Sequence, residues 1–188
     1  MRVYVIRHGE SETNLSKQFT GWLDVHLTEK GKEQAKRAGL RLQHIPFDKI
    51  YSSDLQRARE TAEAALPGCT YEITALAREI NVGNLMTQPF AVLTPEQREE
   101  TVTDGYAAYG GESKEDLYGR IRALLKELEG QNCETVAVFC HGGWLRAMLE
   151  IVLGTYLPRK SVCCDNCAVG IFEFTDNTWM LHSWINQE

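Results

Sequence analysis

The sequence lacks any long hydrophobic run. None of its apolar stretches approaches the roughly 20 residues that a membrane-spanning helix requires. The apolar run at residues 3–6 is also too short for the core of a secretory signal. Of the 188 residues, 43% are hydrophobic and 24% are charged, which is typical of a soluble globular protein. These features predict a cytoplasmic protein.

Positive charge is scarce as well. The chain has 20 lysines and arginines against 26 aspartates and glutamates, and its net charge is −6. Nucleic acids and anionic membranes attract a broadly basic surface, so we predict that the chain binds neither of them. A small phosphorylated molecule is still a possible partner if a few arginines are concentrated in one cleft.

The sequence contains no internal repeat, no low-complexity tract and no linker rich in proline or glycine. We therefore predict a single domain over residues 1–188, a length sufficient for a sizeable core. The segment 81–111 gives mixed signals, and we interpret it as an insertion of loops and short helices.

The six cysteines do not form a recognisable metal-binding pattern. Cys163, Cys164 and Cys167 form a cluster that contains a CxxC, but a structural zinc site usually needs a second pair of ligands, and none is evident. Without an export signal, reduced thiols are the simplest interpretation. We predict no metal and no cofactor, and keep a zinc or redox role for this cluster as an alternative.

Strand and helix signals alternate along the chain. Strands are predicted at residues 3–7, 49–51, 70–73 and 135–140, and the last 20 residues resemble a hairpin of strands 169–174 and 178–185. Helices are predicted at 28–42, 53–66, 144–153 and from Ser113 onward, with Thr28 and Ser53 as N-caps. This order predicts a three-layer α/β sandwich with a mainly parallel sheet and an antiparallel edge.

Two histidines directly follow the two clearest buried strands. His8 follows strand 3–7, His141 follows strand 135–140, and each histidine precedes glycine. In open α/β sheets, ligands bind beyond the carboxyl ends of the strands. If the two strands are neighbours, both imidazoles reach one crevice, where Gly142 and Gly143 allow close approach of the backbone to a ligand. The alternative is that both histidines are ordinary surface or hydrogen-bonded residues.

Arginines near these positions favour an anionic ligand. Arg7 adjoins His8, Arg146 lies close to His141, and Arg57 falls in the first turn of a predicted helix. Guanidinium groups bind phosphate through paired hydrogen bonds, and a helix N-terminus adds favourable amide dipoles. For Arg57, an ordinary role on a helix surface is the competing interpretation.

These residues belong to a longer set of motifs that resembles the histidine phosphatase superfamily, which includes the cofactor-dependent phosphoglycerate mutases. The motifs occur in family order along nearly the whole chain: Arg7-His8-Gly9-Glu10-Ser11 with Asn14; Phe19-Thr20-Gly21-Trp22-Leu23-Asp24; Ser52-Ser53-Asp54-Leu55-Gln56-Arg57-Ala58; Arg78-Glu79 with Gly83; Gly111-Glu112-Ser113; and His141-Gly142-Gly143. The resemblance implies the α/β sandwich of that family and places segment 81–111 as a cover over the active site.

The resemblance also implies roles for individual residues. His8 is the implied nucleophile, Glu79 the implied proton donor, and Thr20 and Gly21 match positions that touch substrate in mutases. The implied phosphate-binding groups are Arg7, Arg57, His141, Asn14 and the backbone at Gly142.

This chemistry is consistent with general principles. Phosphoryl transfer requires in-line geometry and positive groups matched to the phosphoryl oxygens, which arginine and histidine supply without a metal. We expect His8 to be a neutral tautomer held through its other nitrogen, and His141 to be a cationic donor. Glu79 is expected to protonate the leaving oxygen and then accept a proton from water.

The covering segment favours hydrolysis over the mutase reaction. A mutase must also hold the carboxylate of its substrate, yet Arg98 is the only basic residue between Asn81 and Glu112, and the chain is shorter than typical mutases. We therefore predict a metal-independent phosphatase acting on a small phosphomonoester metabolite. Phosphoglycerate mutase activity and a non-catalytic phospholigand-binding module are the alternatives. The oligomeric state and the physiological substrate are left open.

Overall fold

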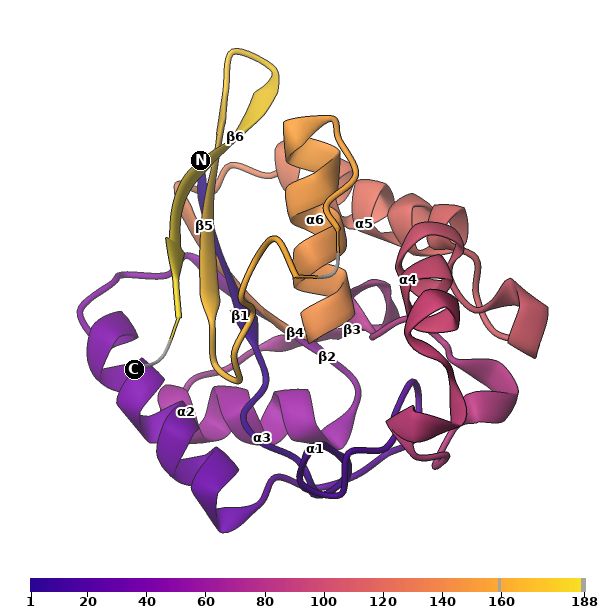
Figure 1. Ribbon diagram of the computed structural model, residues 1–188. Helices are drawn as coiled ribbons and strands as arrows, with labels where there is room; N and C mark the ends of the chain where they lie inside the picture. Colours follow the sequence, from indigo (N-terminus) through magenta and orange to yellow (C-terminus); the bar gives the residue numbers. More distant parts are fainter. Residues whose placement is uncertain (159, 187–188) are drawn as a thin grey trace.

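The computed structural model of the protein describes residues 1–158 and 160–186 (Figure 1). Its centre is a six-stranded sheet with the order β3-β2-β4-β1-β5-β6. The strands are β1 (Arg2–Arg7), β2 (Lys49–Ser53), β3 (Glu72–Thr74), β4 (Thr135–Cys140), β5 (Val169–Thr175) and β6 (Thr178–Ile185).

The sheet is parallel over four strands and antiparallel at one edge. β3, β2, β4 and β1 run parallel to one another, β5 pairs antiparallel with β1, and β6 pairs antiparallel with β5. This confirms the predicted mainly parallel sheet and its terminal hairpin. β1 and β4 are direct neighbours in which Arg7 pairs with Cys140, so the residues that follow these two strands emerge side by side.

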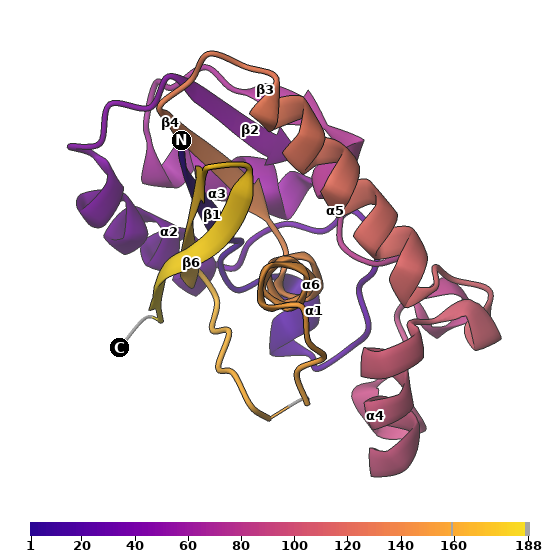
Figure 2. The ribbon, with the colours of Figure 1, turned by 90° about the horizontal axis from the view of Figure 1, so that it is seen from above.

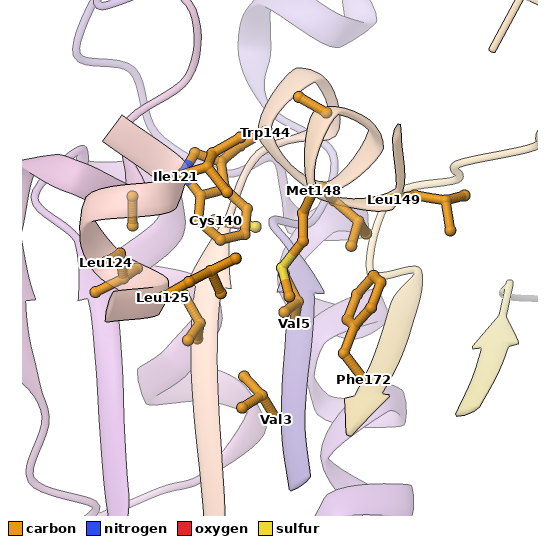
Figure 3. Close-up of a cluster of buried hydrophobic side chains, with 14 of the residues drawn as sticks. Val3, Val5, Ile121, Leu124, Leu125, Cys140, Trp144, Met148, Leu149 and Phe172 are labelled. Atoms are coloured by element: carbon orange, nitrogen blue, oxygen red, sulfur yellow. The ribbon is translucent and has the colours of Figure 1, made fainter. Parts of the chain in front are cut away.

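Helices cover both faces of the sheet (Figures 1 and 2). On one face, α2 (Glu29–Leu42) and α3 (Gln56–Ala65) pack against Ile6, Ala137 and Phe139. On the other, α5 (Lys114–Glu129) and α6 (Gly142–Leu153) pack against the alternate residues of the same strands (Figure 3). Because successive residues of a strand point to opposite faces, the continuous apolar strands β1 and β4 supply both cores. The predicted three-layer sandwich is confirmed.

One of the two predicted helix caps is present, and the structure adds another at Ser113. The Thr28 hydroxyl accepts a hydrogen bond from the Gly31 amide at the start of α2, and Ser113 forms a capping box with Asp116 at the start of α5. α6 starts two residues earlier than predicted, at Gly142, with His141 as its N-cap. Strand β3 lies one to two residues later than predicted.

The predicted capping box at Ser53 and Gln56 is wrong. Ser53 is the last residue of β2, and Leu55 is the N-cap of α3 without a side-chain cap bond. The carboxylate of Asp24, from a distant loop, accepts the Gln56 amide hydrogen at 2.6 Å. A tertiary contact therefore replaces the local cap that the sequence pattern indicates.

The segment 81–111 contains η2 (Gly83–Leu85), η3 (Phe90–Val92), α4 (Pro95–Asp104) and η4 (Ala107–Tyr109). Phe19 forms a small apolar cluster with residues of this segment, including Val82, Leu85 and Leu93. Figures 1 and 2 show α4 at the outside of the molecule, away from the sheet. The short helices α1 (Glu12–Leu15) and η1 (Ala75–Ala77) complete the fold. Within the described residues, no helix combines the length and apolar character needed to span a bilayer.

Candidate active site

The ends of β1 and β4 bring the two histidines together. The His8 amide donates to the Cys140 carbonyl at 2.9 Å, which extends the strand register by one residue. The two imidazole centroids lie 5.2 Å apart, and both side chains are buried. Residues separated by more than 130 positions therefore form one site, as the strand pattern predicts.

His8 has the geometry of a neutral imidazole with one available nitrogen. Its Nδ1 lies 2.6 Å from the Gly9 carbonyl oxygen, which can only accept a hydrogen bond, so Nδ1 carries the hydrogen. Burial lowers the pKa of His8 well below 6.5, and the charges of Arg57 and Arg7 lower it further. At neutral pH Nε2 is consequently unprotonated and carries a lone pair.

Arg57 faces this nitrogen from α3. Its Nε donates a hydrogen bond to the lone pair of His8 Nε2 at 3.3 Å, while Nη1 and Nη2 donate to the carbonyls of Leu23 and Gly21 at 2.9 and 2.8 Å. The side chain is buried, which lowers its pKa to about 10, so the guanidinium remains charged at neutral pH. The structure thus excludes an ordinary surface role for Arg57.

Arg7 lies on the other side of the site, at the end of β1. Its Nη1 donates to the Cys164 carbonyl, and its guanidinium lies against the start of α6. A Cβ atom at Gly142 would lie 3.1 Å from Arg7 Nε. Glycine at this position therefore leaves space for the guanidinium.

Glu79 approaches the same helix terminus from the loop that follows η1. Its Oε2 accepts the Gly143 amide hydrogen at 3.0 Å, and its Oε1 accepts the Ile80 amide hydrogen at 2.9 Å. A Cβ atom at Gly143 would lie 2.4 Å from Oε1, far inside contact distance, so only glycine admits the carboxylate here. The negative charge of Glu79 also raises the pKa of Arg57, against the larger effect of burial.

His141 is expected to be a cationic donor beside a phosphate, and the protein groups around it by themselves favour the neutral ring. Burial and the charges of Arg57, His8 and Arg7 lower its pKa well below 6.5, so the ring is neutral. Its Nε2 lies 2.9 Å from Ser53 Oγ, and no described residue bonds to its Nδ1. His141 is not among the residues that line the adjoining pocket. A phosphoryl dianion beside the ring would favour the charged form.

Asn14 is oriented by a residue near the C-terminus. Its Oδ1 accepts hydrogen bonds from the Ser11 amide at 3.3 Å and from Asn166 Nδ2 at 3.1 Å. Asn166 Nδ2 also lies 3.2 Å from the His8 carbonyl. With its oxygen occupied in this way, Asn14 presents its amide NH2 group as the donor at the pocket that it lines.

Thr20 and Gly21 also line the pocket, as the resemblance implies. The Thr20 hydroxyl lies 2.6 Å from the Thr13 hydroxyl, and Gly21 has a positive φ of 51°. Left-handed backbone of this kind favours glycine, and it directs the Gly21 carbonyl to Arg57.

The pocket above these groups has a volume of about 370 Å³. Part of its wall comes from segment 81–111, through Val82, Phe90, Thr101, Val102 and Tyr106. Two further cations line it, Lys114 from α5 and Arg146 from α6. Both interact with the buried carboxylate of Glu150, Lys114 at 2.7 Å and Arg146 at 4.0 Å. Among the described residues, four cationic side chains and one carboxylate thus line the pocket, in a chain whose net charge is −6.

Comparison with known proteins supports the resemblance. The family model of the histidine phosphatase superfamily (branch 1) matches residues 3–187. The chain belongs to this superfamily. A probable phosphoglycerate mutase GpmB of Salmonella paratyphi A is 31% identical over 196 aligned positions, which cover 98% of this chain and 90% of the relative.

Several solved structures share the fold of this chain. Bacillus stearothermophilus YhfR is 28% identical with a TM-score of 0.86, covering 96% of this chain and 95% of its own. A mycobacterial glucosyl-3-phosphoglycerate phosphatase solved with VO3 is 28% identical with a TM-score of 0.86, covering 97% and 98%. The phosphoserine phosphatase of Entamoeba histolytica, solved with 3-phosphoglyceric acid, is 26% identical with a TM-score of 0.84, covering 100% and 98%.

Several residues at this histidine phosphatase site were not identified from the sequence. Lys114 lies just outside segment 81–111, so the basic residues of that segment do not reveal it. The pattern around Ser53 predicts a helix cap and not a contact with His141. The signal for Ser53 was its position at the end of β2, where the polar side chain meets His141. No local signal identifies Asn166, because its partners lie more than 150 residues away.

The cysteine cluster forms a wall of the site. All six cysteines, each in the described part of the chain, are free thiols. Cys164 lines the pocket, and the Cys167 amide donates to the His8 carbonyl at 3.2 Å. In residues 1–158 and 160–186, His, Cys, Asp and Glu side chains form no group of three placed to hold a metal ion. The zinc alternative for this cluster therefore gains no support from the geometry.

Proposed function

We propose that this histidine phosphatase hydrolyses a small phosphomonoester metabolite through a phosphohistidine on His8. The observation that carries the proposal is the position of His8 Nε2. This nitrogen has a lone pair, lies 3.3 Å from the Arg57 guanidinium and opens into a pocket that Glu79 and Arg7 also line. A nucleophile, two guanidinium groups and an acid are thus gathered around one position for a phosphoryl group.

In the first step, the lone pair of His8 Nε2 attacks phosphorus in line with the leaving oxygen. The P–N bond forms as the P–O bond to the substrate breaks, and Glu79 in its protonated form gives its proton to the leaving oxygen. Arg7, Arg57 and the Asn14 amide stabilise the charge on the three equatorial oxygens. The hydrogen bond from Nδ1 to the Gly9 carbonyl stabilises the positive charge that develops on the ring.

In the second step, water attacks the phosphohistidine. Glu79, now a carboxylate, accepts a proton from the water as the new P–O bond forms and the P–N bond breaks. Inorganic phosphate leaves, and His8 returns to its neutral form. A bound phosphoryl dianion favours the protonated form of His141. We therefore assign His141 as a further hydrogen-bond donor to the phosphoryl group.

We propose one catalytic domain in which segment 81–111 covers the active site. The pocket has a volume of about 370 Å³, which leaves room for a small organic group beyond the phosphate. Its wall is largely apolar on the side of segment 81–111, through residues such as Val82, Phe90 and Tyr106. These features favour a metabolite-sized substrate.

Phosphoglycerate mutase activity is the second candidate. Lys114 and Arg146 line the pocket from outside the covering segment. They are cations that could bind the carboxylate of a phosphoglycerate, although Arg98 is the only basic residue of segment 81–111. Glu150 already offsets part of their charge, and Arg98 does not line the pocket. Among the relatives, the phosphatases from Entamoeba histolytica and the mycobacterium favour hydrolysis, whereas the GpmB protein is named a probable mutase.

One experiment separates the three possibilities. Purified protein is incubated with 3-phosphoglycerate and, separately, with phosphoserine and 4-nitrophenyl phosphate, and the products are followed by ³¹P NMR. We expect inorganic phosphate as the main product and its loss in His8→Ala. Faster formation of 2-phosphoglycerate than of phosphate would establish the mutase, and no turnover of a phosphate panel despite tight binding would establish a binding module.

We propose that catalysis needs no metal, because arginine and histidine side chains supply the positive charge. Activity is therefore expected to persist in EDTA, and vanadate is expected to inhibit by resembling five-coordinate phosphorus. A strict requirement for a divalent cation would contradict this mechanism. Six free thiols are also in keeping with a reducing compartment, and we propose a cytoplasmic location.

A further inference from the structure

The backbone that carries Glu79 lies outside regular secondary structure. Residues 78–82 follow η1 and precede η2, and no helix or strand ladder fixes them. The catalytic geometry of an acid must nevertheless be held closely, because a displacement of about 1 Å can cost on the order of 100-fold in rate. Side chains from elsewhere must supply the missing restraint.

Arg120, on α5, donates hydrogen bonds to three carbonyls of this stretch. Its Nη1 lies 3.1 Å from the Leu76 oxygen and 3.0 Å from the Arg78 oxygen, and its Nη2 lies 3.2 Å from the Glu79 oxygen. The helix that carries Arg120 is anchored in the core by Leu117, Ile121 and other apolar residues. One guanidinium thus ties the backbone of Glu79 to a rigid helix.

Glu112 completes the arrangement. Its Oε1 and Oε2 accept the two remaining donors of Arg120 at 2.8 and 2.9 Å, in a bidentate pair. Oε2 also accepts the Asn81 amide hydrogen at 2.8 Å, and the Glu112 amide donates to the Asn81 carbonyl at 2.9 Å. The residues on both sides of Glu79 are therefore held by one ion pair. All five guanidinium donors of Arg120 are used, a pattern that lysine cannot reproduce.

We propose that Arg120, oriented by Glu112, is a positioning residue for acid catalysis. It holds the carboxyl group of Glu79 at the leaving oxygen through the backbone of residues 76–81. This inference rests on the proposed role of Glu79 as the proton donor. Arg120 itself does not line the pocket, so it acts without touching the substrate.

The test is the dependence of kcat/KM on the pKa of the leaving group, measured with aryl and alkyl phosphates. For Arg120→Met we expect a loss of about 100-fold with phenyl and alkyl phosphates, which need a proton, and less than about threefold with 2,4-dinitrophenyl phosphate, which does not. A merely structural role would lower all rates equally, and an equal loss would overturn the proposal.

The control is Arg122→Met, which removes an exposed arginine of the same helix that pairs with Glu115. It should leave the whole series unchanged. Inhibition by vanadate reports on the phosphate-binding groups and should be retained in Arg120→Met. If that variant does not fold, Arg120→Lys preserves the charge beside Glu112 and is expected to show the same selective loss at a smaller size.

A double variant distinguishes failure of this inference from failure of the proposed function. If Arg120 acts through Glu79, Arg120→Met should have little further effect in a Glu79→Gln background. If the losses in kcat/KM of the two substitutions were additive, the inference about Arg120 would be overturned. The proposed function would still stand if Glu79→Gln alone made kcat/KM depend steeply on the leaving group. A flat dependence for Glu79→Gln would remove the proposed acid and the inference with it.

Discussion

The two halves of the candidate active site are built in different ways. The phosphate half consists of Arg7, His8, Arg57 and His141, which the sheet and the helix α3 hold in place. The acid half consists of Glu79 and its neighbours in residues 78–81, which lie in irregular backbone and depend on hydrogen bonds from distant side chains such as Arg120 and Trp22.

This difference shows which contacts fix the position of each catalytic side chain. In the phosphate half, the register of β1 and β4 sets the position of both histidines before any side-chain contact is made. In the acid half, the position of Glu79 depends on several separate side-chain hydrogen bonds. Single substitutions far from the substrate can therefore displace Glu79. Substitutions of surrounding residues should therefore displace the side chains of the phosphate half less than they displace Glu79.

The largest effect is expected from a change inside the phosphate half. Arg57→Lys removes the fork that contacts His8 and the carbonyls of Gly21 and Leu23. We expect kcat/KM for 4-nitrophenyl phosphate to fall by about 10²- to 10³-fold, the usual cost of one donor to a developing charge. Arg59→Lys, two residues along the same helix, is the matched control, and equal losses in the two variants would show that Arg57 is not part of the site.

A smaller effect is expected when the acid half alone is disturbed. In Gly143→Ala, the new Cβ atom would lie 2.4 Å from Glu79 Oε1 and must displace the carboxylate. We expect a loss of about 10- to 100-fold that is confined to substrates with poor leaving groups, with unchanged inhibition by vanadate.

The control for this variant is Gly119→Ala. Gly119 lies within α5, and a Cβ atom there has no neighbour within 4 Å, so activity should be retained and the helix stabilised by up to about 1 kcal/mol. Loss of vanadate inhibition in Gly143→Ala would show that the two halves are not independent.

A weaker effect is expected from the residue that orients Asn14. Asn166→Ala removes the hydrogen bonds to Asn14 Oδ1 and to the His8 carbonyl. We expect an increase of about fivefold in the inhibition constant of inorganic phosphate, from the loss of roughly 1 kcal/mol of oriented hydrogen bonding. The exposed neighbour Cys163, changed to serine, should leave it unaltered. An unchanged constant in Asn166→Ala would mean that Asn14 does not need this support.

The smallest effect is expected on stability, and it depends on pH. Burial lowers the pKa of His141 in the folded protein well below 6.5, so below pH 6.5 the unfolded chain binds more protons than the folded one. The free energy of unfolding should therefore fall as the pH falls, and His141 should contribute about 1 kcal/mol of this loss between pH 6.5 and 5.5.

Urea unfolding at these two pH values measures that contribution. His141→Asn should reduce the loss of stability on acidification, whereas the exposed His44→Asn is the control for a general effect of removing an imidazole. If His141→Asn kept the full loss of the natural protein, the buried ring would not be the group that titrates.

The same division explains how far the sequence predicts the site. Strand patterns place His8 and His141 each at the end of a buried strand, because the apolar run and the glycine after each histidine are local signals. That the two strands are neighbours is a property of the tertiary structure. Glu79 follows only from the family resemblance, since no local pattern marks an acid in irregular backbone. The contacts of Lys114, Arg120 and Asn166 depend on tertiary structure, and so does the Asp24 carboxylate that replaces the predicted cap of α3.

The burial of Arg57 affects how strongly salt weakens the binding of an anionic substrate. Its guanidinium has already exchanged water for the carbonyls of Gly21 and Leu23, so little solvent must be reorganised there when an anion arrives. Mobile ions screen exposed charges within about 10 Å at 0.1 M salt, but they screen buried pairs far less. Attraction at this point should thus be nearly independent of ionic strength, even though the surface of the molecule as a whole repels anions.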